Sequence, residues 1–116
     1  MNKLKVCLIG YGYWGPKLAR NFQNSNFFKL ISVSDKSQSN LLKAKKDFPF
    51  IKTSKDYKKL ITDNIDIVVI ATPTNTHFQI SEFALKMKKQ VFLLVHPMNN
   101  FKTFIFHQKF RIIMNH

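Results

Sequence analysis

The sequence predicts an α/β fold, a doubly wound parallel sheet of about five strands in a single domain. Three observations predict it. Short apolar runs alternate with amphipathic segments along most of the 116 residues. The first run, residues 5–9, leads directly into GYGYWG at residues 10–15, which has the spacing GxGxxG. The second run ends in an acidic residue, Asp35.

Apolar periodicity justifies each element in order. Residues 5–9 form a continuous apolar run typical of a strand buried on both faces. Residues 13–24 have apolar residues at helical spacing, with Pro16 in the first turn, where its missing N–H costs little. We then expect a strand at 28–35, a helix at 37–48 capped by Ser37, a strand at 50–53, a helix at 54–63 capped by Ser54, a strand at 65–72, a helix from 75 or 76 to about 88, and a strand at 90–95. The expected strand order is 3-2-1-4-5.

The chain changes character after Pro97. Residues 101–113 hold four phenylalanines, and no Asp or Glu follows Glu82. Their apolar spacing fits a helix and a strand equally well. We therefore divide the chain into a domain of residues 1–98 and an aromatic, basic tail of residues 99–116 whose structure is left open.

Composition limits the class of protein. No apolar run reaches the ~18 to 20 residues of a membrane span, and no small-residue cleavage site follows the basic start. Cys7 is the single cysteine, so it has no internal disulfide partner. These features predict a soluble, cytoplasmic protein without a membrane partner. No metal site is expected, and the sequence does not indicate an oligomeric state.

The formal net charge of +13 raises the alternative of a nucleic-acid-binding protein. However, 17 of the 19 basic residues are lysines, whereas phosphate and base recognition favours the planar arginine side chain. The lysines also fall in short groups on expected helix faces. We interpret them as solvated surface charges and do not expect a nucleic-acid partner.

Each glycine of GYGYWG has a distinct role in a strand-turn-helix unit. Gly10 permits the tight turn, Gly12 allows the backbone to approach a diphosphate, and Gly15 lets the helix pack closely on the sheet. Asp35 lies 20 residues beyond Gly15, where a carboxylate accepts hydrogen bonds from a ribose. This predicts a Rossmann NAD(P)-binding fold. The alternative is a purely structural turn, with Asp35 capping the next helix. Asp35 favours NAD, while Lys36 leaves NADP open.

Three segments resemble the N-terminal domain of the Gfo/Idh/MocA family of NAD(P)-dependent oxidoreductases, which act mostly on sugars, inositols and sugar derivatives. They are GYGYWGPKLARNF, ATPTNTHF at residues 71–78, and QVFLLVHPM at residues 90–98. The resemblance implies hydride transfer between a nicotinamide and a sugar-like hydroxyl or ketone. It implies that the cofactor is bound by Gly10, Gly12, Tyr13, Trp14, Gly15, Asp35, Thr72, Pro73, Asn75 and His77. His77 would lie near the ribose, or alternatively serve only at a helix start.

The third segment departs from the family. His96 stands where the family has a lysine near the nicotinamide and substrate, and Val95 replaces a glutamate. His96 is therefore a candidate proton donor, although it could simply end a strand. The family's larger second domain, which carries the substrate pocket, has no counterpart in these residues. We expect a truncated gene product that is inactive alone and meets a sugar-like substrate only with a second domain. A non-catalytic dinucleotide- or partner-binding remnant is the main alternative.

Overall fold

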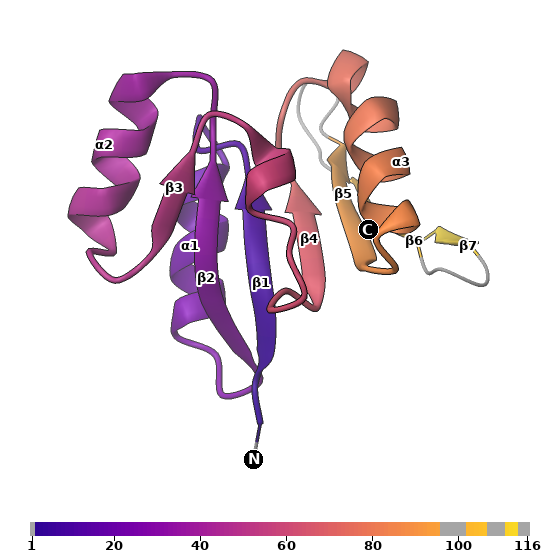
Figure 1. The fold of residues 1–116 in the computed structure, drawn as a ribbon, viewed down its shortest axis with the longest axis horizontal. Helices are drawn as coiled ribbons and strands as arrows, with labels where there is room; N and C mark the ends of the chain where they lie inside the picture. The colour runs from indigo at the N-terminus through magenta and orange to yellow at the C-terminus, as the bar shows by residue number, and fades with distance from the viewer. Residues whose placement is uncertain (1, 96–101, 107–110, 114–116) are drawn as a thin grey trace.

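A computed structural model describes residues 2–95, 102–106 and 111–113 of the chain. Its strands form one sheet in the order β3-β2-β1-β4-β5-β6-β7, with α3 and η1 in front of the sheet and α1 behind it (Figure 1). The elements are β1 (Leu4–Ile9), α1 (Gly15–Gln23), β2 (Phe28–Ser34), α2 (Gln38–Asp47), β3 (Lys52–Ser54), η1 (Tyr57–Lys59), β4 (Ile67–Ile70), η2 (Thr74–Thr76), α3 (His77–Lys86), β5 (Gln90–Val95), β6 (Lys102–Phe106) and β7 (Arg111–Ile113).

The first five strands are parallel in the order 3-2-1-4-5, which confirms the predicted fold class. Alternate residues of β1 point into two separate cores. Val6 and Leu8 pack with residues of α1 and α2, whereas Cys7 and Ile9 pack with residues of α3 and with Leu60 near η1. Because β1 is central, all four of these side chains are almost completely buried. The sheet is therefore covered on both faces, as a doubly wound fold requires.

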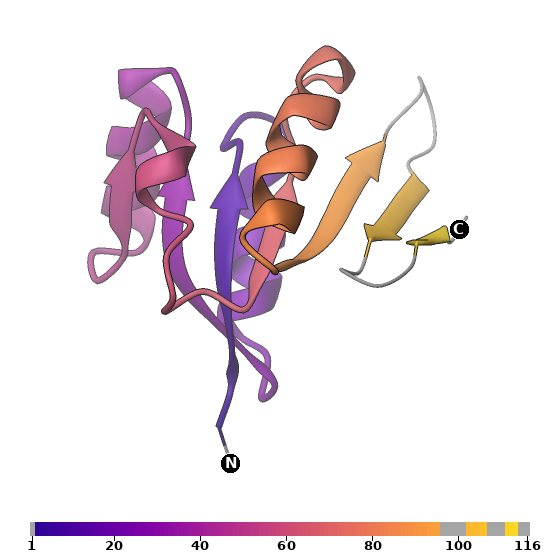
Figure 2. The ribbon, with the colours of Figure 1, turned by 45° about the vertical axis from the view of Figure 1, so that its right-hand side comes forward.

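The tail segments extend the same sheet. Residues 102–106 form β6, which pairs antiparallel with β5, and residues 111–113 form β7, which pairs antiparallel with β6. Figure 2 shows β6 running against the direction of β5 at one edge of the sheet. The sequence left this region unassigned, and the strand alternative is the one that the structure adopts.

The predicted helix at residues 54–63 is wrong. Only a single 3-10 turn, η1, forms there, and Asp56 caps it by accepting a hydrogen bond from the Lys58 N–H at 3.0 Å. Ser54 instead ends β3. The apolar residues Leu60 and Ile61 are buried against the sheet by a connecting loop. The spacing of these apolar residues therefore reflects the packing of a loop on the sheet and not the periodicity of a helix.

Candidate functional site

The turn after β1 lies at the carboxyl end of the sheet and depends on Gly10. Its φ is +106°, which L side chains rarely adopt, and a Cβ there would lie 2.8 Å from the carbonyl carbon and oxygen of Ala71. The Gly10 N–H donates to the Ser34 carbonyl at 2.7 Å. The turn is thus held against the ends of both neighbouring strands, β2 and β4.

The other two glycines differ in their surroundings. A Cβ on Gly15 would overlap the carbonyl oxygen of Gly10, so this glycine brings the start of α1 close to the turn. A Cβ on Gly12 would meet nothing within 4 Å. Among the described residues, no contact therefore requires a glycine at position 12, and the space above its backbone is open to a ligand that approaches closely.

Asp35 follows β2 directly and reaches the glycine turn. Its Oδ2 accepts hydrogen bonds from the Tyr11 N–H at 2.7 Å and from Asn40 Nδ2 at 3.2 Å, and its Oδ1 accepts from the Ser37 N–H at 2.8 Å. Three donors therefore fix the orientation of the carboxylate. Each carboxylate oxygen can accept more than one hydrogen bond, so capacity remains for a ligand hydroxyl.

The buried side chain of Tyr11 holds the turn in place. Its ring is almost completely buried, and its hydroxyl donates to Asp47 Oδ2 at the end of α2, at 2.6 Å. Burial, together with the hydrogen bond to Asp47, raises the pKa of Tyr11 above its ordinary value. Tyr11 therefore connects the turn to Asp35 through its backbone and to α2 through its phenol.

A cavity of about 430 Å³ opens beside Asp35. Residues that follow the carboxyl ends of neighbouring strands supply most of its polar wall, and Tyr57 and Ile80 add apolar surface. The polar and glycine residues of this wall are Gly10, Gly12, Ser34, Asp35, Lys36, Asn40, Lys55, Thr72, Asn75, Thr76 and Gln79.

A second cavity of about 320 Å³ also has Gly12 in its wall. Gly12, Ala71, Thr72 and Pro73 line both cavities, so the two meet at the glycine turn and at the end of β4. The second cavity adds a different set of side chains, namely Tyr13, Trp14, Thr74 and Leu94.

The segment between β4 and α3 has a defined conformation. Thr72 Oγ1 and Thr76 Oγ1 share a hydrogen bond of 2.6 Å, and Thr76 Oγ1 donates to the Pro73 carbonyl at 2.7 Å. His77 is buried, and its Nε2 lies 2.8 Å from the Thr72 carbonyl oxygen. Since a carbonyl only accepts, Nε2 carries the proton. His77 thus holds the shared wall of the two cavities from behind.

Comparison with known proteins identifies this arrangement. Residues 4–100 match the family model described as "Oxidoreductase family, NAD-binding Rossmann fold" of GFO_IDH_MocA. The chain belongs to the Gfo/Idh/MocA family. Within it, the myo-inositol 2-dehydrogenase of Thermotoga maritima is 32% identical over 90 residues, which are 77% of this chain and 27% of that protein.

Two solved structures show the same fold. Biliverdin reductase from Synechocystis, in complex with biliverdin and NADP+, has a TM-score of 0.75 at 30% identity and covers 82% of this chain and 30% of its own. Scyllo-inositol dehydrogenase from Lactobacillus casei, with NAD(H) and scyllo-inositol, has a TM-score of 0.74 at 28% identity. The match covers 79% of this chain and 28% of that protein. The chain spans about a quarter of the length of the curated relatives it matches. It therefore carries the NAD(P)-binding domain of the Gfo/Idh/MocA family.

The structure brings most of the residues suggested by the family resemblance to the two cavities. Gly15 and His77 line neither cavity; Gly15 packs against Gly10, and His77 contacts the Thr72 carbonyl. His96 lies outside the described residues. The cavity-lining residues from that prediction are Gly10, Gly12, Tyr13, Trp14, Asp35, Thr72, Pro73 and Asn75.

Several lining residues were not predicted. Asn40, Lys55, Tyr57, Gln79 and Ile80 line the first cavity, and Leu94 lines the second. Lys55 follows β3 as Asp35 follows β2, so the rule that ligands bind at the carboxyl ends of parallel strands could have found it.

No helix in the described part of the chain is long and apolar enough to cross a membrane. No group of three or more His, Cys, Asp or Glu side chains within it is placed to hold a metal ion.

Proposed function

We propose that the dinucleotide lies across both cavities, with the diphosphate over Gly12. The observation that carries this proposal is the open space above Gly12, at the junction of two cavities and next to an oriented carboxylate. The N–H groups at the start of α1 and the positive end of its dipole favour an anion there. Asp35 accepts hydrogen bonds from the adenosine ribose, and Tyr57 and Ile80 contact the adenine in the first cavity.

The nicotinamide half occupies the second cavity. There Trp14 and Tyr13, whose rings lie 5.2 Å apart edge to face, form one wall, and Thr72 and Pro73 form the other. Asn75 and Thr72 offer polar groups to the cofactor. His77 acts on the cofactor indirectly, by fixing the carbonyl of Thr72.

The reaction we propose is that of an oxidoreductase acting on a sugar or polyol. The bound nicotinamide supplies the hydride chemistry, while the protein binds and orients it and handles the proton. Support comes from the inositol dehydrogenases among the similar proteins. The described domain corresponds to about a quarter of such a protein, and the part of the reaction that we propose for it is to bind and orient the cofactor. His96 stays the sequence-based candidate for the proton donor.

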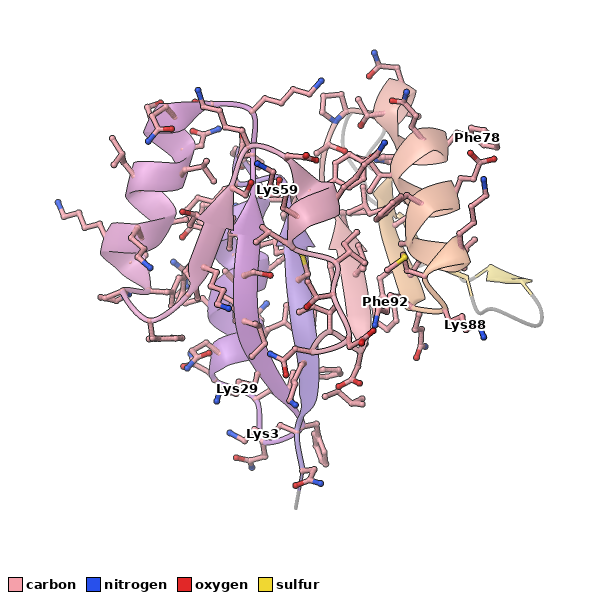
Figure 3. The ribbon with its side chains drawn as sticks, in the orientation of Figure 1. Lys3, Lys29, Lys59, Phe78, Lys88 and Phe92 are labelled. Atoms are coloured by element: carbon pink, nitrogen blue, oxygen red, sulfur yellow. The ribbon has the colours of Figure 1, made fainter. Side chains whose placement is uncertain are left out.

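We further propose that the protein works in the cytoplasm and does not bind nucleic acid. Figure 3 shows Lys59 and Lys88 apart from each other and from Lys3 and Lys29, which lie at the starts of the adjacent strands β1 and β2. Scattered lysines of this kind suit a solvated surface better than a nucleic-acid groove. A dinucleotide-binding protein without catalysis remains the alternative, and turnover with an added second domain would discriminate the two.

The test is calorimetric titration of the purified chain with NADH. Saturable one-to-one binding supports the proposal. Asp35→Ala should weaken it at least tenfold because the ribose hydroxyls lose a charged acceptor. Asp63→Ala removes the same charge from an exposed site outside both cavities and should leave affinity unchanged. Equal losses in the two variants, or no binding by the wild type, would overturn the proposal.

A further inference from the structure

Helix α2 is attached to the candidate site at both of its ends. At its start, the N–H of the capping residue Ser37 donates to Asp35 Oδ1 at 2.8 Å, and Asn40 Nδ2 donates to Asp35 Oδ2 at 3.2 Å. At its last residue, Asp47 Oδ2 accepts a hydrogen bond from the Tyr11 phenol at 2.6 Å. A helix of this length spans about 15 Å, so the two attachments lie at opposite ends of one rigid element.

Tyr11 belongs to the glycine turn and connects three parts of the molecule. Its N–H donates to Asp35 Oδ2 at 2.7 Å. Its ring is buried in the same apolar core as Leu41 and Ala44 of α2. Its phenol reaches Asp47, which is exposed. One residue therefore joins the carboxylate of the site to a surface carboxylate at the other end of α2.

The phenol oxygen of Tyr11 is not needed to fill the core. The residues that surround the ring are apolar, and a phenylalanine would occupy the same volume. A buried phenol needs a partner for its O–H, and here the partner is a carboxylate. A hydrogen bond to a charged acceptor is roughly twice as strong as one between neutral groups. The bond with Asp47 therefore fixes Tyr11 relative to α2, and with it the direction of the Tyr11 N–H.

We propose that Tyr11 is a positioning residue for the cofactor, whose bond with Asp47 aligns the Tyr11 N–H and, through it, the Asp35 carboxylate that accepts from the ribose. This inference rests on the proposed binding of the dinucleotide. Neither Tyr11 nor Asp47 lines either cavity. Asp47 therefore influences cofactor affinity from the surface, without touching the cofactor.

The experiment is a double-mutant cycle of Tyr11→Phe with Asp35→Ala, in which NADH affinity is measured by calorimetric titration. Tyr11→Phe keeps the ring and the N–H, and the carboxylate that loses its partner is exposed to water, so no buried charge is left unpaired. We expect Tyr11→Phe to weaken NADH binding about threefold to tenfold. In the Asp35→Ala background the same substitution should change affinity less than about twofold, because the carboxylate that Tyr11 orients is gone.

Substitutions of Asp47 test the surface end of the same connection. Asp47→Ala should weaken NADH binding as much as Tyr11→Phe does, and the two together should weaken it no further than either alone. Asp47→Asn keeps an acceptor oxygen for the phenol and should recover most of the loss. Asp63→Ala is the matched control, since it removes an exposed carboxylate outside both cavities. Circular dichroism checks that each variant is folded, and the Asp47 variants decide the test if Tyr11→Phe does not fold.

The outcomes separate this inference from the proposed function. Equal weakening by Tyr11→Phe in both backgrounds, or wild-type affinity in Asp47→Ala, would show that the positioning role is wrong while cofactor binding stands. If the folded wild type does not bind NADH, the proposed function fails as well. A loss that requires Asp35 and that Asp47→Asn largely restores supports the positioning role.

Discussion

At the scale of single residues, Gly10 and Gly12 serve different purposes although only Tyr11 separates them. Gly10 has φ +106° and lies against the Ala71 backbone, so a side chain there is strained and crowded. We expect Gly10→Ala to lower the free energy of unfolding by about 2–4 kcal/mol, from backbone strain and overpacking. Urea denaturation measures this.

Gly12→Ala is the control for that measurement. Its Cβ would meet nothing within 4 Å in the part of the chain that the structure describes, so the free energy of unfolding should change by less than about 1 kcal/mol. Equal destabilisation by the two substitutions would contradict the assignment of Gly10 to structure and Gly12 to the ligand.

Cys7 gives a pH-dependent prediction at the same scale. Complete burial raises the pKa of its thiol from 9.0 to about 11, with a smaller opposing effect from the neighbouring Ser32 side chain. The folded state therefore favours the neutral thiol. Its contribution is fully present below pH 9 and is lost as the pH rises from 9 towards 11. Unfolding free energies measured across this window should fall less steeply for Cys7→Ala than for the wild type. Parallel profiles would contradict the prediction.

At the scale of elements, the segment between β4 and α3 depends on His77. His77→Leu removes the donor to the Thr72 carbonyl and leaves this partly buried acceptor without it, so the wall shared by both cavities should loosen. We expect NADH affinity to fall about fivefold to tenfold, measured by calorimetry. His77→Gln keeps an N–H donor and should recover part of the loss. Equal affinities in the wild type and both variants would show that His77 does not position the wall.

The elements that the sequence predicted well are those with strong local signals. The apolar run at residues 5–9 and the glycines after it correctly indicated a buried strand and a tight turn, and Asp35 was expected to close the second strand near that turn. The helix predicted at residues 54–63 was wrong because apolar spacing does not distinguish a helix from a loop that packs on a sheet. Lys55 reaches the site because Ser34 pairs with Ser54 at the ends of β2 and β3, and it was missed because the glycine motif draws attention to the first two strands rather than to the end of the third.

At the scale of the whole molecule, bound cofactor should stabilise the fold, because the ligand contacts several strand ends at once. At a free NADH concentration of 100 times Kd, linkage adds about 2.7 kcal/mol, which for a domain of this size raises Tm by roughly 10 °C or more. Differential scanning calorimetry measures the change. Inorganic pyrophosphate at the same concentration is the control for general anion effects on a chain of net charge +13. An equal rise with pyrophosphate would contradict specific binding.

The most direct measurement uses Trp14, the one tryptophan of the chain, which lines the second cavity. Its fluorescence is followed during NADH titration of the wild type and of Gly12→Val, since reduced nicotinamide absorbs where tryptophan emits. We predict saturable quenching in the wild type and none in Gly12→Val, with both proteins folded by circular dichroism. Identical quenching curves would contradict the claim that the dinucleotide passes over Gly12.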